Sequence, residues 1–519
     1  MGSAGGYEVE LKLELRPQDV PLISSLRSLP QARLSAPKAE QIYSVYFDTE
    51  GHELRRTGYS LRVRHAGSKR LQTVKAMSAS AGPALERRED EVALRGAVPD
   101  IAQISDTDLR EKVGAALAEG LLTPIFETTV LRTTRRIRTA EGGEVELAID
   151  TGDLRANGSA RRICEVELEL KHGAPAALYS IARAINAKVP TRVMRLSKSD
   201  RGYALCGEAI ARPQKAKAPD LDTDASVRDS FRSAMASGLL QLVANEPAVV
   251  EMREIEGLHQ FRVALRRIRA GLKLFAPLGE DGRLGALDEE VRALAQVCGV
   301  ARDLDVFETE ILPRGMTHLK ARRAALGPVQ AACSAARDEA WRAVLAKLAD
   351  PAFTALVLDL AALAAEGPNA LGAGIKRKAL EAPARDFARE GLDKLFKKCT
   401  KLGRKLETLS DEERHTLRKR LKELRYSGEF FAPLFAPKAA KAYSKRLNSL
   451  QDSFGALNDL ATAQRLIAQF VTGTAIHSPL ARAGAALVAW YAQTADEARG
   501  ETAEAWAKFA KHPPFWQET

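Results

Sequence analysis

Cysteine is scarce in this chain, and what there is of it is scattered. The five cysteines are odd in number and no two form a CxxC pair, which disfavours both a disulfide framework and a cysteine zinc site. The first residues contain neither the basic nor the apolar segment of a secretory signal. No run of about 18 apolar residues indicates a membrane span. We therefore expect a soluble, cytoplasmic protein.

Acidic residues are outnumbered by basic ones. The chain has 78 Lys and Arg against 67 Asp and Glu, a formal net charge of +11. With 519 residues, of which 45% are hydrophobic, it is long enough for two or three globular domains. The positive balance favours a polyanionic partner and does not choose among nucleic acid, an acidic membrane and a phosphate polymer.

Up to about residue 172 the hydrophobic pattern has a period of two, which is typical of strands. In residues 7–15, for example, Glu8, Glu10 and Lys12 share one face. The same alternation recurs at 59–65, 144–150 and 165–171. A charged strand face usually contacts water. Here several strands have one, with different signs, and these faces would line a single lumen if the sheet closes into a barrel.

Such a lumen would contain charges of both signs. Its acidic residues would be Glu8, Glu10, Asp150, Glu165 and Glu167, and its basic residues Lys12, Arg62, Arg64, Lys75 and Arg132. Carboxylates suit Mg²⁺ or Mn²⁺, which share their coordination shell with substrate phosphates, and Arg and Lys suit phosphate oxygens. This combination predicts phosphoryl transfer. The pattern does not decide whether Glu89 and Glu91 face the lumen or the surface.

The segment EVELK (8–12) resembles the ExExK motif of the CYTH domain, the triphosphate tunnel metalloenzyme fold. Further segments follow in the family's order: YSVYFDT (43–49), LRVR (61–64), TVK (73–75), RREDE (87–91), FETTVLR (126–132), LAID (147–150), CEVELEL (164–170) and LSKSDRGY (196–203). The resemblance covers about residues 5–206. It implies an eight-stranded antiparallel tunnel that binds a triphosphate group end-on.

The CYTH resemblance also implies individual roles. The metal ligands would be Glu8, Glu10, Asp150, Glu165 and Glu167. The phosphates would be held by Arg62, Arg64, Lys75, Arg132 and Lys198, with Lys12 at the tunnel floor. Glu169 extends the acidic stripe, either as a further ligand or as a solvated neighbour.

After residue 206 the character of the sequence changes. A segment rich in Ala, Pro and Lys (207–224) predicts an interdomain linker, and the remainder has helical periodicity. An internal repeat relates His259 to His415 (415 − 259 = 156), and the same offset relates Arg262 to Arg418 and FAPL at 275–278 to FAPL at 431–434. The repeat predicts two helical bundles, at about 225–365 and 375–510.

One face of each repeated helix is basic. The first copy presents His259, Arg262, Arg266, Arg269 and Lys273, and the second His415, Arg418, Lys422 and Arg425. A charged helix face is ordinarily just solvated. Neither of these faces contains an acid, however, so the like charges repel one another unless an anion is bound. We predict that both bind a polyanion, with the histidines as binding groups and not nucleophiles.

The helical part resembles the CHAD domain over about residues 225–510. The resemblance is carried by HQFRVALRRIRAGLKLF (259–275), VARDLDVF (300–307), HTLRKRLKELRYSGEFF (415–431) and LQDSFGALNDLATA (450–463). It implies a basic groove between two four-helix bundles that binds inorganic polyphosphate, with the basic residues named above on its helices. Asp303 and Asp459 are interpreted as structural partners of these bases.

The expected fold class is α+β, with an N-terminal eight-stranded antiparallel β-barrel and flanking helices, followed by all-α duplicated four-helix bundles. Fused CYTH–CHAD chains resemble bacterial inorganic triphosphatases. The prediction is therefore hydrolysis of tripolyphosphate to pyrophosphate and phosphate with Mg²⁺ or Mn²⁺, in the cytoplasm or at polyphosphate granules. The alternatives are a barrel acting on thiamine triphosphate or a nucleoside triphosphate, an adenylate cyclase, and a non-catalytic polyphosphate-binding scaffold. Nucleic-acid binding is disfavoured because aromatic platforms and helix-turn-helix or zinc patterns are missing.

Overall fold

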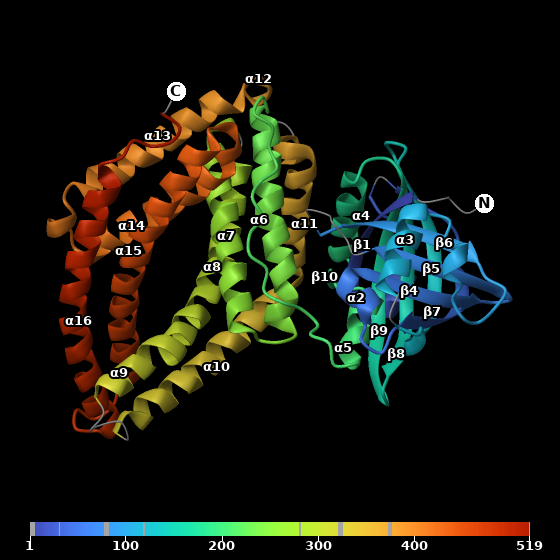
Figure 1. The fold of residues 1–519 in the computed structure, drawn as a ribbon, viewed down its shortest axis with the longest axis horizontal. Coiled ribbons are helices and arrows are strands. Elements are labelled where there is room, and N and C mark those ends of the chain that lie inside the picture. Colours follow the sequence, from blue (N-terminus) through green and yellow to red (C-terminus); the bar gives the residue numbers. More distant parts are fainter. Residues whose placement is uncertain are drawn as a thin grey trace. The chain divides into compact units, whose positions relative to one another are not determined.

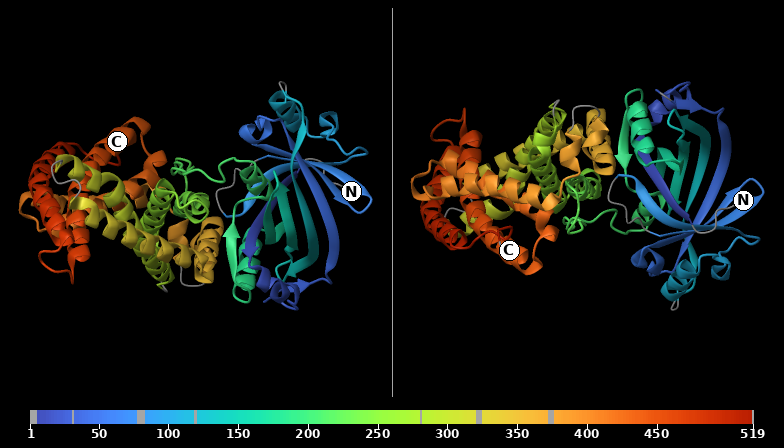
Figure 2. Two further views of the ribbon diagram at one scale, coloured as in Figure 1. Left: turned by 90° about the horizontal axis from the view of Figure 1, so that it is seen from below. Right: turned by 90° about the horizontal axis from the view of Figure 1, so that it is seen from above.

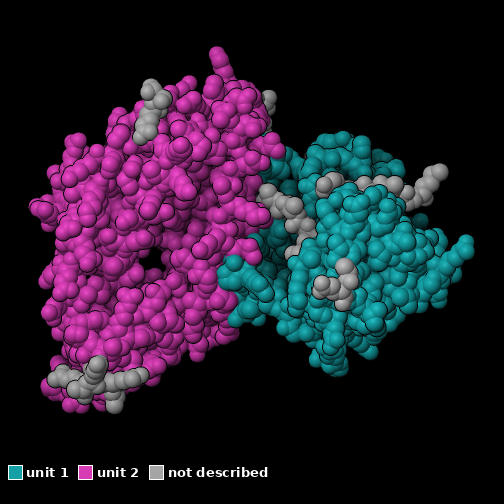
Figure 3. All heavy atoms as spheres, in the orientation of Figure 1, with its two compact units in different colours: residues 1–213, 243–252, 349–366 teal, residues 214–242, 253–348, 367–519 magenta. Residues whose placement is uncertain are grey.

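The computed structural model describes residues 6–30, 32–76, 83–117, 120–279, 282–319, 325–371 and 376–517. Residues 5 and 375, at two predicted domain boundaries, lie outside this described part. The chain divides into two compact units (Figure 3). The first consists of Met1–Pro213, Val243–Met252 and Ala349–Glu366, and the second of Gln214–Leu242, Arg253–Leu348 and Gly367–Thr519.

In the described part of the first unit, eight antiparallel strands close a barrel (Figures 1 and 2). Their order is β1–β6–β5–β4–β3–β7–β8–β9, and β9 pairs back with β1. The strands are β1 (Gly6–Leu15), β3 (Lys38–Asp48), β4 (Tyr59–Ala66), β5 (Lys69–Ala76), β6 (Leu85–Ala93), β7 (Thr123–Thr139), β8 (Glu144–Ala156) and β9 (Ser159–His172). The predicted eight-stranded antiparallel barrel is confirmed.

Two short strands extend the barrel wall. Strand β2 (Ala32–Leu34) pairs with one end of β7. Strand β10 (Thr191–Met194) pairs with the second half of β1, while β6 pairs with its first half. One edge of β1 is therefore paired along nearly its whole length, and the other edge pairs with β9 over Glu10–Glu14, where the barrel closes.

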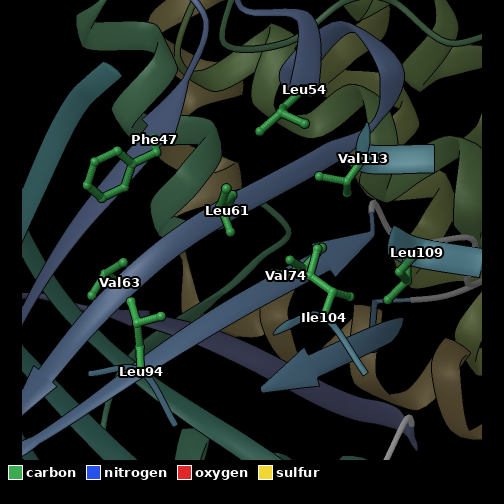
Figure 4. Close-up of a cluster of buried hydrophobic side chains, with 9 residues drawn as sticks. All are labelled: Phe47, Leu54, Leu61, Val63, Val74, Leu94, Ile104, Leu109 and Val113. Carbon is green, nitrogen blue, oxygen red and sulfur yellow. The ribbon is translucent and has the colours of Figure 1, made fainter. Parts of the chain in front are cut away.

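The hydrophobic core of this unit lies outside the barrel wall. Because strand side chains alternate between faces, the charged residues point into the lumen and the apolar ones point outward. Leu61 and Val63 of β4 pack in one cluster with Leu109 and Val113 of α3 (Thr107–Ala116) (Figure 4). Other short helices of this unit are α1 (Val20–Ser24), α2 (Glu53–Thr57), α4 (Ala176–Asn186) and α5 (Lys198–Leu205).

The remainder of the described chain is helical. Its main helices are α6 (Val227–Val250), α7 (Ile255–Phe275), α8 (Arg283–Val306), α9 (Leu312–His318), α10 (Gly327–Ala349), α11 (Pro351–Glu366), α12 (Arg377–Leu380), α13 (Ala384–Gly403), α14 (Asp411–Phe431), α15 (Pro437–Val471) and α16 (Pro479–Ala510). Among the described residues, no single helix is long and apolar enough to cross a membrane, although α10 and α11 meet that test as a bent pair.

The sequence repeat is also a structural repeat. Helix α14 begins and ends 156 residues after α7 (411 − 255 = 156 and 431 − 275 = 156). A 3-10 turn follows each helix at the same offset, at Ala276–Leu278 and Ala432–Leu434. Glu254 caps the start of α7 and Ser410 caps the start of α14, again 156 residues apart (410 − 254 = 156). The helical half of the predicted fold class is confirmed.

Candidate active site

A cavity of about 430 Å³ lies inside the barrel. All of the predicted barrel residues line it except Asp150 and Glu165, which are fully buried. Its charged lining residues are Glu8, Glu10, Lys12, Arg62, Arg64, Lys75, Arg87, Glu89, Glu91, Arg132, Glu146, Glu167, Glu169, Lys171 and Lys198. The structure thus brings residues from distant parts of the chain to one enclosed space.

The strand register places opposite charges directly across from each other. Lys12 of β1 faces Glu167 of β9, and the two side chains form an ion pair. Lys75 of β5 faces Glu89 of β6, with Nζ 3.0 Å from a carboxylate oxygen. Such cross-strand pairs stabilise a sheet, and they also keep the cavity close to neutral.

Two cations and three carboxylates form the most buried part of the site. Arg132 donates to both oxygens of Asp150, from Nε at 2.7 Å and from Nη2 at 2.6 Å. Lys198, at the start of α5, contacts Asp150 at 2.6 Å and Glu167 at 3.0 Å, and it also pairs with Glu165. Burial alone lowers the pKa of Lys198, but the three carboxylates outweigh burial and raise it, so this ammonium stays charged.

The two arginines of β4 have fewer partners inside the cavity. Arg62 donates to the hydroxyl of Tyr46 at 3.3 Å, and Arg64 lies 3.8 Å from Glu91. The Nε atoms of both arginines are buried and make no hydrogen bond. The neighbouring Arg62, together with burial, lowers the pKa of Arg64 to about 10. Two adjacent guanidinium groups with unused donors are suited to a phosphate group.

A second basic cavity, of about 720 Å³, lies between α7 and α14 in the second unit. All of the predicted groove residues line it except His259 and Arg425, so its predicted lining consists of Arg262, Arg266, Arg269, Lys273, His415, Arg418 and Lys422. We call this cavity the groove. Arg425 donates to Asn448 at 3.1 Å and lies over the ring of Tyr426.

The cations of the groove are largely surrounded by other cations. Arg262, Arg266 and Arg418 each have a buried nitrogen without a hydrogen-bond partner. Burial lowers the pKa of Lys422 to about 5, and Arg266 and Arg418 add to this fall. Three acids also line the groove, Asp288, Glu289 and Glu423, and Asp288 of α8 pairs with Arg269 at 2.8 Å. Nothing in the sequence pattern had indicated that pair.

Family models match both parts of the chain. The model of the CYTH domain matches residues 6–203, and the model of the CHAD domain matches residues 233–468. The chain joins a CYTH domain to a CHAD domain. The CYTH domain indicates a triphosphate tunnel metalloenzyme that acts on phosphoanhydride bonds, and both domains are associated with the binding of triphosphate or polyphosphate.

Several solved structures are similar to one or other part. The CHAD domain from the plant Ricinus communis is 29% identical, with a TM-score of 0.50, and the match covers 57% of this chain and 96% of that one. PptA from Streptomyces chartreusis is 18% identical, with a TM-score of 0.45, covering 55% and 100%. HpAC1 from Hippeastrum, described as a candidate adenylyl cyclase with a dominant triphosphatase activity, is 20% identical, with a TM-score of 0.27, covering 39% and 97%.

The acidic residues of the CYTH domain fit a metal ion in two places. Ligand oxygens of Asp150, Glu165 and Glu167 lie within 4.8 Å of one another, and this group can bind a metal. Both oxygens of Glu165 are held by cations, one by Lys198 and the other by Arg201. A hard divalent cation accepts carboxylate ligands of this kind, but it would have to compete with the internal ion pairs.

The second place lies on the wall of the CYTH cavity itself. Glu10 faces Glu169 across the sheet, and its two oxygens lie 2.9 Å from Arg87 Nη2 and 3.0 Å from Lys12 Nζ. Burial raises the pKa of Glu169, and the neighbouring Glu8 adds to that rise against the pull of Lys171. Like charges directly opposite each other destabilise a sheet unless a cation lies between them. Glu8, Glu10 and Glu169 therefore also suit a divalent cation.

Sequence reasoning missed some residues of the CYTH cavity. Arg87 lines it and lies 2.9 Å from Glu10, and Tyr46 and Ser197 line it as well. The alternation along RREDE (87–91) places Arg87 on the same face as Glu89 and Glu91, so the signal was present. Glu89 and Glu91, left open between lumen and surface, both line the cavity.

Proposed function

We propose that this protein is a metal-dependent inorganic triphosphatase, which hydrolyses tripolyphosphate to pyrophosphate and phosphate in the CYTH cavity. The observation that carries the proposal is the composition of the cavity wall. Carboxylates alternate with arginine and lysine around an enclosed space of about 430 Å³. Phosphoryl transfer depends mainly on positioning and on neutralising charge, and this wall supplies both.

The basic residues would hold the phosphates. Arg62 and Arg64 have unused donors in the cavity, and they can form forked, charge-assisted hydrogen bonds with phosphate oxygens. Lys12 and Lys75 are paired with carboxylates in the empty cavity. An incoming triphosphate would draw these ammonium groups away from their acids, because it offers more negative charge at the same distance.

The carboxylates released in this way would hold the metal. Glu8 loses its partner when Lys75 turns to the phosphate, and Glu167 loses one of its three partners when Lys12 does the same, keeping Arg132 and Lys198. A bound Mg²⁺ or Mn²⁺ would neutralise phosphate charge and polarise a water molecule. The buried Asp150 keeps Arg132 and Lys198 in place, with both of its oxygens in use.

The lining of the cavity supports an inorganic substrate. Among the described residues that line it, Tyr46 is the only one with an aromatic ring. That ring already stacks on Phe126, with the ring centroids 4.4 Å apart. Proteins that hold a nucleobase or a similar ring usually offer it a stacking surface. The described wall has no second ring for this purpose, which favours tripolyphosphate over an organic triphosphate.

We propose further that the groove of the CHAD domain binds inorganic polyphosphate. Arg262 and Lys273 lie eleven residues apart on α7 (273 − 262 = 11), about 16 Å along the helix axis. A phosphate chain carries repeated negative charges along its length, whereas a small anion carries its charge at one place. Cations spread over this length of helix, with few acids among them, therefore match a phosphate chain better.

The test is to measure phosphate release from tripolyphosphate, ATP, thiamine triphosphate and long-chain polyphosphate, with Mg²⁺, with Mn²⁺ and with excess chelator. We expect metal-dependent release from tripolyphosphate that exceeds release from the other three. Faster release from ATP or thiamine triphosphate would favour the organic-triphosphate alternative. No release from any substrate, together with tight binding of polyphosphate, would leave a non-catalytic binding protein.

A further inference from the structure

The two copies of the internal repeat differ at one position of the groove. The 156-residue offset relates Arg266 of α7 to Lys422 of α14 (422 − 266 = 156), and both residues line the groove. An arginine keeps its proton under all ordinary conditions, whereas the amine of a lysine can lose it. The second copy therefore has an amine that can act as a nucleophile where the first copy has a permanent cation.

Lys422 lies among cations on its own helix and on the helix of the first copy. On α14, Arg418 lies four residues before it and Arg425 three residues after it, which places all three side chains on one face. Arg262 and Arg266 of α7 line the same cavity. The side chain of Lys422 is half-buried, so water screens it poorly from these charges.

The acids of this region do not neutralise Lys422. Those that line the groove or face its cations are Asp288, Glu289, Glu423 and Asp459. Asp288 is engaged with Arg269 at 2.8 Å. Glu289 is engaged with Arg292 at 3.0 Å, within α8. In the part of the chain that the structure describes, none of the four acids forms an ion pair with Lys422.

These surroundings favour the uncharged form of the Lys422 amine. Burial lowers its pKa to about 5, and the positive charges of Arg266 and Arg418 add to this fall. At neutral pH the nitrogen of Lys422 therefore has a free electron pair, whereas an ordinary exposed lysine is almost wholly protonated. A free amine is the form that attacks an electrophile, and the groove gives a small molecule access to it.

The same surroundings would stabilise a negative charge at this position. Arg262 Nη1, Arg266 Nε and Arg418 Nε are buried and make no hydrogen bond. All three arginines line the cavity that Lys422 lines. Unused guanidinium donors form charge-assisted hydrogen bonds with a carboxylate when one is present. A reaction that converts the amine into an anion would thus be favoured here, whereas at an isolated surface lysine it would find no such partners.

We propose that Lys422 is a carbamylation site whose substrate is carbon dioxide. The electron pair of Nζ forms a bond to the carbon of CO₂, one carbon–oxygen π bond gives its electrons to oxygen, and Nζ releases one proton to water. The product is a carbamate, in which the side chain carries a single negative charge, and the reaction needs no oxidant or further reactant. Carbon dioxide is small and uncharged, so its entry does not favour protonation of the amine.

A carbamate at Lys422 would oppose the binding of polyphosphate. It would occupy arginine donors that a phosphate chain needs, and it would place a negative charge beside that chain. Bound polyphosphate, in turn, favours the protonated form of Lys422, which does not react with carbon dioxide. Each therefore excludes the other. This effect rests on the proposed polyphosphate binding by the groove, whereas the formation of the carbamate does not.

The first experiment detects the carbamate on the full chain near neutral pH. The protein is equilibrated with carbon-13 bicarbonate and carbon dioxide, and the carbamate is observed by NMR. It is then trapped as an ethyl ester with triethyloxonium and located by peptide mass spectrometry. Lys422→Arg keeps a positive charge and removes the reactive amine. The matched control is Lys419→Arg, the same change at an exposed lysine of α14 that also lines the groove.

We expect the trapped ester at Lys422 in wild type and in Lys419→Arg. A folded wild-type protein without this ester, at saturating carbon dioxide, would overturn the proposal. An ester at Lys419 in place of Lys422 would overturn it as well, because the half-buried position would then have no advantage. Saturating polyphosphate should reduce trapping at Lys422 by at least about ten-fold. Equal trapping with and without polyphosphate would overturn the mutual exclusion.

The second experiment measures the affinity for a labelled polyphosphate by fluorescence anisotropy. Bicarbonate with carbon dioxide is compared with chloride at equal pH and ionic strength. We expect carbon dioxide to weaken binding by about ten-fold in wild type and in Lys419→Arg, and by less than about two-fold in Lys422→Arg. An equal loss in all three proteins would show that bicarbonate acts only as a competing anion, and would overturn the effect on binding.

Together the two experiments separate failure of this inference from failure of the proposed function. A carbamate at Lys422 in a chain that does not bind polyphosphate would support the modification site and reject the proposed binding by the groove. Polyphosphate binding that is insensitive to carbon dioxide, with no trapped ester, would support that binding and overturn the modification site. Neither result depends on hydrolysis in the CYTH cavity.

Discussion

In the barrel cavity most cations face a carboxylate on the neighbouring strand, whereas in the groove of the helical unit most cations face one another. Lys12 meets Glu167 and Lys75 meets Glu89 across the barrel wall. In the groove, the neighbours that lower the pKa of Lys422 are Arg266 and other arginines. Asp288 is the acid that the described groove provides for one of them, Arg269.

This difference separates two ways of handling a phosphate anion. In the barrel cavity the cations are paired with carboxylates. These internal ion pairs must be exchanged for contacts with substrate and metal, so the acids and bases of the cavity act together. In the groove most cations have no carboxylate partner, so they repel one another. A bound polyanion relieves this repulsion, and few internal ion pairs have to be broken first. We therefore expect the barrel to depend on metal and the groove to depend on salt and pH.

Removing acids from the barrel should have the largest effect. Glu8→Gln together with Glu10→Gln removes two carboxylates of the cavity wall while keeping the size of the side chains. We expect the rate of metal-dependent hydrolysis of tripolyphosphate to fall by at least about a hundred-fold, a loss comparable with that of a residue that stabilises charge in the transition state. Phosphate release in steady state measures this, and polyphosphate binding should stay unchanged.

Glu40→Gln is the control for that change, since Glu40 is an exposed residue of the barrel strand β3. Hydrolysis by this variant should match wild type. If the double variant at Glu8 and Glu10 also hydrolysed tripolyphosphate at the wild-type rate, these two residues would not be metal ligands.

Removing bases from the groove should weaken polyphosphate binding without affecting hydrolysis. For Arg262→Gln with Arg418→Gln we expect a loss of about 10- to 100-fold in affinity for long-chain polyphosphate at low salt, and a shallower dependence of affinity on salt concentration. Fluorescence anisotropy with a labelled chain measures both. Arg482→Gln with Arg499→Gln, two exposed positions on α16, is the paired control. Equal losses in the two double variants would indicate only a general effect of net charge.

The groove should also bind polyphosphate more tightly as the pH falls. Without a ligand, the pKa of Lys422 is about 5, because of burial and the neighbouring arginines, so its amine is neutral at pH 7. A polyanion favours the charged form and raises this pKa, so the complex binds more protons than the free protein. Affinity then rises by as much as about ten-fold per pH unit between about pH 8 and pH 6, and levels off near pH 5.

Calorimetry of polyphosphate binding in buffers with different ionisation enthalpies counts the protons taken up. Lys422→Met should remove most of this uptake near pH 7. The remaining pH dependence would come from His415, which also lines the groove and whose pKa is lowered by burial. Uptake that is the same in wild type and in Lys422→Met would show that Lys422 is charged before the ligand binds.

The smallest effect is expected from Asp288, one of the acids that line the groove. Asp288→Asn removes the partner of Arg269 and one negative charge from the lining. We expect affinity for polyphosphate to rise by about two- to three-fold, the range of a partly exposed ion pair. Glu339→Gln, an exposed position of α10 paired with Arg342 within its own helix, is the control. A loss of affinity in Asp288→Asn would mean that Asp288 positions Arg269 for the ligand.

Local patterns could be predicted well from the sequence, because they depend only on the period of the alternation along a strand or helix and on the offset between the two repeats. Alternation was enough to group Glu8, Glu10 and Lys12 on one face, and the 156-residue offset anticipated the matching bounds of α7 and α14. Contacts between elements depend on register and packing, which one sequence does not specify. The pairing of Arg269 with Asp288 is of this second kind.

The position of the apolar core outside the barrel wall affects how this protein can change over time. Leu61 and Val63 stabilise the fold from the outer surface, packed against α3, while the inner surface consists of polar groups. A substitution inside therefore leaves the packing that sustains the fold almost untouched, and most of its effect falls on the chemistry. Mutations that alter substrate preference can thus accumulate in such a barrel at little cost in foldability, so one scaffold can give rise to a lineage of enzymes with different phosphate substrates.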